Sequence, residues 1–163
     1  WSGAPEVTMP FGPGIPLPGA VLQLCEERFP DQQTGTTLIP IDNTVPQITE
    51  GNNFLQAPAL TPASPANFLD IVAQLFLKNS SAGTITVALF QDSVANALAA
   101  TGVTNVANGR HSVGIRHIKH ANAAAATTFK IRAGGSAAGT VTLNEDLYGQ
   151  VESSFVRVSE IMG

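Results

Sequence analysis

Three histidines, His111, His117 and His120, fall within ten residues and come closest in type and spacing to a metal site. If this segment is a strand, His117 and His120 point to opposite faces, because their separation is odd. Two ligands from one strand need an even spacing, so we expect no metal site within one chain. One histidine from each of three copies could still meet on an axis and bind a cation. The simpler interpretation is interface or surface histidines.

The other reactive side chains form no catalytic constellation. Cys25 is the only cysteine, so no intrachain disulfide can form, and we interpret it as a small buried hydrophobe. Glu26 and Glu27 are adjacent in a strand-like run and face apart. Glu145 and Asp146 belong to a loop-like segment, where a solvated turn is a simpler interpretation than a calcium site. We therefore expect a non-enzymatic protein without catalytic residues, cofactor or metal.

Composition limits the possible partners. The 163 residues are 44% hydrophobic and only 12% charged, about half the usual charged share. Such a surface suits polar, uncharged β faces or a subunit partly buried by copies of itself. The net charge is −4, with eight Lys and Arg in total, so we expect no nucleic-acid binding. No apolar run of 18 residues occurs, and we expect no membrane insertion.

Residues 1–18 differ from the rest of the chain, with Pro at positions 5, 10, 13, 16 and 18 among several glycines. Proline lacks a backbone donor and glycine has no side chain to pack, so we predict an extended N-terminal arm ahead of one domain, residues 19–163. A free linker has no use for apolar side chains. We therefore expect the arm to lie on a neighbouring subunit or a larger assembly. The predicted docking residues of the arm are Trp1, Val7, Met9, Phe11, Ile15 and Leu17.

Residues 60–77, "LTPASPANFLDIVAQLFL", fit two patterns. Apolar residues at 68, 71, 72, 75 and 76 have helical spacing, whereas those at 69, 71, 73, 75 and 77 alternate as in a strand. The neighbouring segments favour the strand, because the other candidate elements are strands too. We predict a strand over residues 68–78.

Short alternating runs separated by turn signals such as "NSSAG" and "AGGSAAG" fill the rest of the domain. Their spacing predicts an all-β, antiparallel sandwich or barrel. Residues 36–41 contain a proline and are expected to form an edge strand. Residues 94–100 are rich in Ala, and we expect one or two helical turns there. The predicted strands are 20–27, 36–41, 53–60, 68–78, 84–91, 111–120, 127–133, 140–143 and 154–161.

Several strings also occur in a recognisable order: "GAVLQ" (19–23), "IPIDNTVPQITEG" (39–51), "LTPASPANFLDIVA" (60–73), "ALFQDSVANALAA" (88–100), "TTFKIRAGG" (127–135) and "VSEIMG" (158–163). Taken together they resemble a family of bacteriophage virion appendage proteins, the tail-fibre and head-fibre domains. The resemblance implies a jelly-roll-like β-sandwich of the C1q and tumour-necrosis-factor type that forms a homotrimer. It implies no shared catalytic residues.

Apolar side chains on both faces of several strands support self-association, because a lone sandwich needs only one apolar face. The predicted trimer-interface residues are Val72, Phe76, Phe90 and His117. We expect loops 79–83, 101–110, 120–126 and 133–139 to face outward, where a host surface glycan or protein could bind.

Our leading hypothesis is a trimeric structural protein of the virion, attached by its arm to other virion proteins. The alternatives are a capsid decoration (cement) protein and a lectin-like carbohydrate-binding module. Trp1 and Tyr148 are the only Trp and Tyr, and this scarcity of stacking platforms counts against the lectin-like module.

Overall fold

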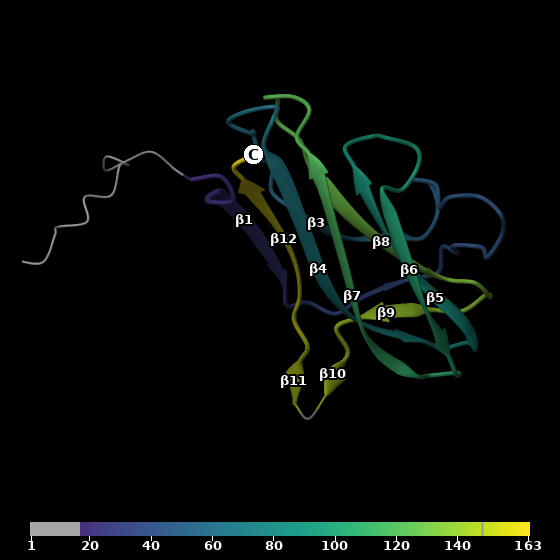
Figure 1. Ribbon diagram of the computed structural model, residues 1–163. Coiled ribbons are helices and arrows are strands. Elements are labelled where there is room, and N and C mark those ends of the chain that lie inside the picture. The colour runs from purple at the N-terminus through teal and green to yellow at the C-terminus, as the bar shows by residue number, and fades with distance from the viewer. Residues whose placement is uncertain (1–16, 148) are drawn as a thin grey trace, which may run out of the picture.

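The computed structural model describes residues 17–147 and 149–163, and every regular element in that part of the chain is a β-strand (Figure 1). The strands are β1 (Val21–Phe29), β2 (Gln33–Gly35), β3 (Asn52–Gln56), β4 (Phe68–Asn79), β5 (Gly83–Gln91), β6 (Ala99–Asn105), β7 (Arg110–His120), β8 (Phe129–Gly135), β9 (Val141–Leu143), β10 (Asp146–Leu147), β11 (Gln150–Val151) and β12 (Ser154–Ile161).

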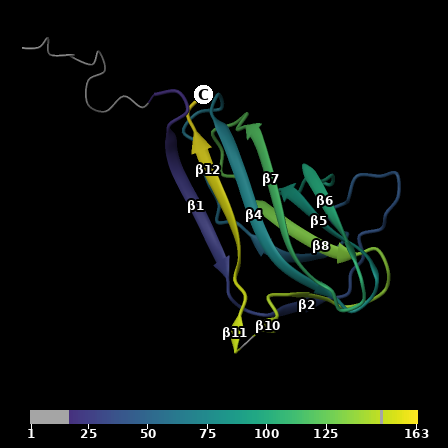
Figure 2. The same cartoon turned by 60° about the horizontal axis from the view of Figure 1, so that its bottom comes forward.

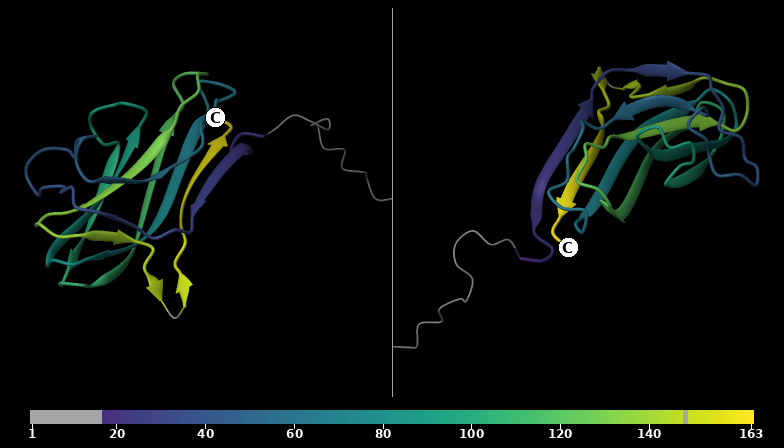
Figure 3. Two further views of the ribbon diagram at one scale, coloured as in Figure 1. Left: turned by 180° about the vertical axis from the view of Figure 1, so that it is seen from behind. Right: turned by 90° about the horizontal axis from the view of Figure 1, so that it is seen from above.

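Two antiparallel sheets form the sandwich. The six-stranded sheet has the order β1-β12-β4-β9-β2, with β7 paired to the other side of β4. The four-stranded sheet has the order β3-β8-β5-β6, and β10 and β11 form a separate hairpin. The first and last long strands, β1 and β12, lie side by side at one edge of the six-stranded sheet (Figures 1 and 3).

The ambiguous segment 60–77 is resolved in favour of the strand. Residues 60–67 form a loop, and β4 then runs for 12 residues from Phe68. Its side chains alternate strictly between buried and half-buried. The helical spacing arises because the second face of β4 also carries apolar residues, so that two alternating rows superimpose.

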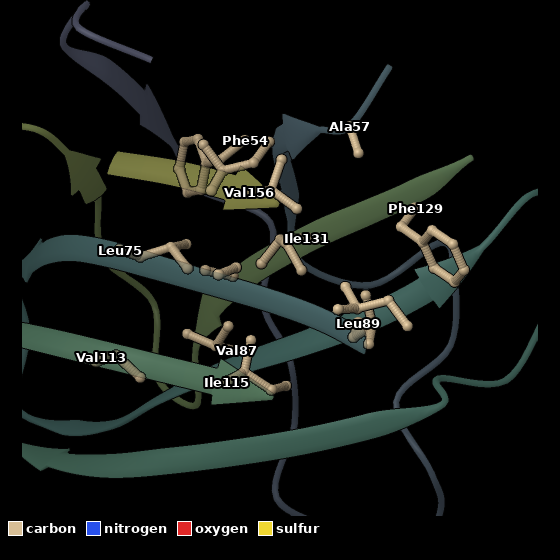
Figure 4. Close-up of a cluster of buried hydrophobic side chains, with 14 of the residues drawn as sticks. Phe54, Ala57, Leu75, Val87, Leu89, Val113, Ile115, Phe129, Ile131 and Val156 are labelled. Atoms are coloured by element: carbon tan, nitrogen blue, oxygen red, sulfur yellow. The ribbon is translucent and has the colours of Figure 1, made fainter. Parts of the chain in front are cut away.

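The core lies between the sheets and is built from the inward row of each strand (Figure 4). Leu75 of β4, Val113 and Ile115 of β7 and Val156 of β12 meet Val87, Leu89 and Ile131 of the four-stranded sheet. Each fully buried aliphatic side chain of this size contributes about 1.5–3 kcal/mol to folding. Burial of these rows fixes the register of each strand, since a one-residue slip would expose them.

The predicted edge strand at residues 36–41 is wrong. The chain pairs as β2 at residues 33–35 and then crosses the outer side of the four-stranded sheet. Ile39 is buried there, and its N–H donates to the carbonyl of Gly135 at 3.1 Å. Gly134 permits this close crossing, because a Cβ there would lie 2.8 Å from the backbone of both Thr37 and Ile39.

Two further expectations are corrected. Residues 36–51, which run from β2 to β3 across the four-stranded sheet, are here called the crossing segment. Residues 94–100 form no helical turn, because residues 96 and 97 pair with residues 47 and 46 of this segment and residues 99–100 already belong to β6. The expected loops 101–110 and 133–139 are also shorter than predicted. Residues 101–105 complete β6 and residues 133–135 complete β8, so only residues 106–109 and 136–140 remain as connections.

The connections gather at the two ends of the sandwich. Hydrogen bonds join the segments 79–84, 105–108 and 136–140 at one end. At the other end, the N–H of Asn122 donates to Pro65, and that of Gly19 donates to Met162. Loop 120–126 therefore lies where the arm enters, not with the other predicted outward loops. The β10–β11 hairpin projects at the end away from the C-terminus (Figure 2).

A buried carboxylate joins three of the segments on which the family resemblance rests. Glu160 of β12 is fully buried, and its Oε1 accepts hydrogen bonds from Ala63 N at 2.8 Å and Asn67 Nδ2 at 2.6 Å. Its Oε2 accepts from Gln23 Nε2 of β1. Burial raises the pKa of Glu160, but these hydrogen bonds outweigh that effect and lower the pKa below its ordinary value.

Leu17 and Pro18 are the only arm residues that the structure describes. Leu17 is exposed, and its carbonyl accepts a hydrogen bond from Ala20 N at 2.9 Å across a turn with Gly19 at φ +85°. The other predicted docking residues, Trp1, Val7, Met9, Phe11 and Ile15, lie outside the described residues. The part of the chain that the structure describes contains no helix long and apolar enough to cross a membrane.

Candidate subunit interface

The outward side of the six-stranded sheet, here called the outer face, carries the second apolar row of β4. The pairing registers place the even-numbered residues of β4 and β7, the odd-numbered residues of β12 and the facing residues of β1 on this side. Leu24 and Ile118 are 54% and 49% exposed. The large apolar side chains of the outer face are Leu24, Phe68, Val72, Phe76, Ile118, Phe155 and Ile161.

Two ion pairs lie among these apolar side chains. Arg116 donates from Nε and Nη2 to the two carboxylate oxygens of Asp70, at 2.8 and 3.0 Å. Arg28 lies 2.9 Å from the carboxylate of Glu26. Exposed pairs add little stability to the protomer. Their consequence here is that both carboxylates of the outer face are already neutralised by cations of the same chain.

Arg157 differs from these two arginines. It lies on β12, opposite Glu26 of β1 and Val72 of β4. Its Nε is buried and has no hydrogen-bond partner among the described residues. A buried N–H without an acceptor costs about 1–3 kcal/mol. The outer face thus combines an apolar surface that no described segment covers with one polar donor that lacks an acceptor among the described residues.

The predicted interface residues separate into two groups. Val72 and Phe76 lie half-buried on the outer face, in one row of β4. Phe90 does not lie there: it is fully buried in a second small core with Ile39 and Ala88, beneath the crossing segment. His117 pairs with the inward-facing Ile71, so it points to the opposite side of the sheet from Val72. Phe90 is therefore wrong as an interface candidate because it is fully buried, whereas His117 lies off the outer face and its role stays a prediction.

The histidines do not converge. His117 and His120 lie on opposite faces of β7, as the spacing predicts. The ring of His120 contacts the ring of Phe68 on the outer face, with centroids 4.2 Å apart. His111 hydrogen-bonds to the buried Asn105 at 2.9 Å. Within residues 17–147 and 149–163, no three His, Cys, Asp or Glu side chains are grouped to hold a metal ion.

The remaining candidate side chains have structural surroundings. Cys25 is half-buried against the main core, and this burial raises the pKa of its thiol, which disfavours the nucleophilic thiolate. Glu145 accepts hydrogen bonds from Lys78 and Arg110, and these lower the pKa of its carboxyl. A shallow open hollow lies in the β10–β11 hairpin, lined by Leu147, Gln150, Val151 and Glu152.

Arg157 and Phe155 were not among the predicted interface residues, although the sequence contains the signal for both. Alternation in residues 154–161 places Phe155, Arg157 and Ile161 on one side of the strand. Alternation does not show which strands lie next to this one in the sheet. The pairing of β12 with both β1 and β4 is what brings these residues beside Leu24 and Val72.

Comparison with known proteins identifies the fold and no family. No family model matches the chain, and no curated protein matches it. Among solved structures, the chain is similar to Eiger TNF from S. frugiperda, with 12% identity, a TM-score of 0.51 and coverage of 87% of this chain and 94% of that one. This likeness confirms the predicted jelly-roll-like sandwich of the tumour-necrosis-factor type.

Two other solved structures are similar at lower scores. One is a chain of infectious bursal disease virus, Gx strain, with 12% identity, a TM-score of 0.42 and coverage of 99% of this chain and 42% of that one. The other is a Bacillus endospore appendage, with 12% identity, a TM-score of 0.35 and coverage of 94% and 100%. The relationship to bacteriophage appendage proteins stays a prediction from the sequence.

Proposed function

We propose that this chain is a non-enzymatic structural protein of a bacteriophage virion, and that it assembles as a homotrimer through the outer face. The observation that supports the proposal most strongly is the combination of apolar side chains and already paired charges on that face. Its apolar row is continuous with the sandwich but uncovered, and its carboxylates are already paired within the chain. Apolar cores with few free charges are typical of obligate contacts between copies.

The position of the arm supports a role in attachment. The arm enters beside the C-terminus and loop 120–126. Connections 80–82, 106–109 and 136–140 gather at the opposite end. If the arm binds other virion proteins, this opposite end faces away from the virion. A host surface glycan or protein would then be contacted there, by loops built mainly of Ser, Ala, Asn and Gly.

The first test is the mass in solution, measured by light scattering after size-exclusion chromatography. A mass near three times 16.9 kDa is expected. A Val72→Lys variant, which places an additional cation beside Arg116 and Arg157 in the middle of the outer face, should run as a folded monomer. A wild-type chain that is monomeric at all accessible concentrations would contradict the trimer and the role assigned to the outer face.

Capsid decoration is the alternative within the same class, and the arm distinguishes it from receptor binding. A variant that lacks residues 1–16 should lose binding to intact virions or capsids if the arm provides attachment. Glycan-array binding that survives the same deletion would instead assign receptor recognition to the domain. Binding to capsids that is independent of the arm would contradict the attachment proposed here.

A further inference from the structure

We propose that the N-terminal arm of one copy docks on the outer face of the next copy, and that Glu6 of the arm supplies the acceptor that Arg157 lacks. The proposal rests on the homotrimer proposed above and specifies what covers part of its interface. The docking area is the β1–β12 half of the outer face. Its residues are Leu24, Phe155, Arg157 and Ile161.

The side chain of Arg157 needs a hydrogen-bond acceptor. The Nε of Arg157 is buried without a hydrogen-bond partner among the described residues. The nearest carboxylates on the same face belong to Glu26 and Asp70, which already hold Arg28 and Arg116. An arginine among apolar side chains is stabilised by a carboxylate that pairs with it directly. Neither carboxylate hydrogen-bonds to Arg157 Nε in this structure, and we infer that the acceptor comes from the arm of a neighbouring copy.

The arm carries one carboxylate among apolar side chains. Glu6 is the only charged side chain in residues 1–18, and Val7, Met9, Phe11 and Ile15 are apolar. The docking area offers the matching pattern, with one unpaired arginine among Leu24, Phe155 and Ile161. Prolines at 5, 10, 13 and 16 favour an extended segment that lies across a sheet, not one that joins its hydrogen-bond ladder.

The arm is long enough to extend from Leu17 to Arg157 of a neighbouring copy. The arm enters at Leu17, next to Gly19, whose N–H is bonded to the carbonyl of Met162 just after β12. Arg157 lies five residues before Met162, which is about 17 Å along a strand. Eleven residues separate Leu17 from Glu6, and an extended proline-rich chain of that length spans about 34 Å. Four strands are only about 19 Å wide. The arm begins at the edge of the six-stranded sheet, and its span exceeds the width of four strands. It is therefore long enough to reach the outer face of an adjoining copy.

The β4–β7 half of the outer face remains for direct contact between copies. Val72, Phe76 and Ile118 lie in that half, together with the Asp70–Arg116 pair. The Asp70–Arg116 pair is closed within the domain, so packing of another copy on this half requires no further charged partner for it. The arm thus accounts for the half that has an unpaired donor, and symmetric packing of the domains accounts for the half that has none.

The experiment is a charge exchange on the full chain, with association measured by sedimentation over a dilution series. Arg157→Glu and Glu6→Arg should each weaken association by about 10-fold to 100-fold, as expected for the loss of a charge-assisted hydrogen bond. The double variant, Glu6→Arg with Arg157→Glu, should regain most of the lost affinity. Asp31→Arg makes the same change in net charge as Glu6→Arg, at an exposed position outside the strands of this face, and should leave association unchanged.

Each outcome has one meaning. If Arg157→Glu weakens association while Glu6→Arg does not, and the exchange brings no rescue, the arm is not the occupant and Arg157 contacts another group. If the wild type is a trimer and neither variant changes it, this inference is overturned and the proposed function stands. A monomeric wild type overturns both. Far-UV circular dichroism of every variant must match the wild type, so that loss of folding is not mistaken for loss of contact.

Discussion

Replacement of Glu160 by glutamine tests whether one buried carboxylate holds the loop 61–67 and β1 to the end of β12. Glutamine keeps the shape of the side chain but removes its charge. Its oxygen can still accept from Ala63 N and Asn67 Nδ2. Its amide nitrogen then faces Gln23 Nε2, so at least this third hydrogen bond is lost.

The magnitude follows from the difference between charged and neutral hydrogen bonds. A hydrogen bond to a charged group contributes about 1.5–3 kcal/mol, and a neutral one about 0.5–1.5 kcal/mol. One bond lost and two weakened amount to about 3.5–6 kcal/mol, but glutamine also removes the cost of burying a charge. We therefore expect Glu160→Gln to lower the free energy of unfolding by about 2–3 kcal/mol at pH 7. Glu160→Ala leaves the buried Asn67 and Ala63 donors without acceptors, and we expect about 3–5 kcal/mol.

The effect should depend on pH, with a sign set by the lowered pKa of Glu160. A carboxyl whose pKa is lower in the folded than in the unfolded state, where it is about 4.3, binds more protons when unfolded. Its contribution is fully present above that unfolded value and is lost as the pH falls through the folded pKa. The difference between wild type and Glu160→Gln should therefore be largest at pH 7 and should shrink below about pH 4.

The assay is urea denaturation at pH 7 and at pH 3.5, at one fixed protein concentration, because association also stabilises the folded state. Glu27→Gln is the matched control: this carboxylate lies on β1 but is exposed, and we expect a change below about 0.5 kcal/mol. Equal stability of Glu160→Gln and wild type at pH 7 would refute the argument. So would a difference that is the same at both pH values.

Three further changes test the division between core, crossing segment and outer face. Phe90→Ala should destabilise the protomer by about 3–5 kcal/mol in thermal or urea unfolding, because Phe90 is fully buried; if it instead dissociates a folded oligomer, its placement in the second core is wrong. Gly134→Ala should destabilise the fold and expose the crossing segment to limited proteolysis, since the added Cβ meets backbone at 2.8 Å; an unchanged melting temperature would contradict that close approach. Cys25 in the native chain should react with a thiol reagent more slowly than in urea, because burial raises the pKa of the thiol; equal rates would show that this burial is absent.

Local pattern was sufficient where one strand face is buried and the other is not. Residues 68–78 and 154–161 were predicted as strands, and the structure confirms both as β4 and β12. Alternation also placed Val113, Ile115 and His117 on one face of β7. The prediction for residues 154–161 and the face assignment in β7 depend only on the two-residue period of a strand. The prediction for residues 68–78 also needed the strands predicted on either side of it.

Predictions failed where a segment distant in sequence decides the environment. Residues 36–41 look like a short strand, yet they cross the four-stranded sheet and bury Ile39. Gly134 and Gly135 look like a turn, yet they continue β8, and the small size of Gly134 leaves room for the crossing segment. Neither outcome can be derived from period or propensity, because each depends on which chain passes over the sheet.

The same dependence explains why apolar residues on two faces of a strand do not by themselves indicate an interface. In β5, Val87 and Leu89 face the main core, and Ala88 and Phe90 face a second core that the crossing segment covers. In β4, Val72 and Phe76 form an equivalent second row, but no segment of the described chain covers it. Both strands look alike in sequence, and the difference between them is whether the chain supplies its own cover. The second row of β4, and not that of β5, therefore supports self-association, and we propose that the arm supplies the acceptor for Arg157 on the outer face.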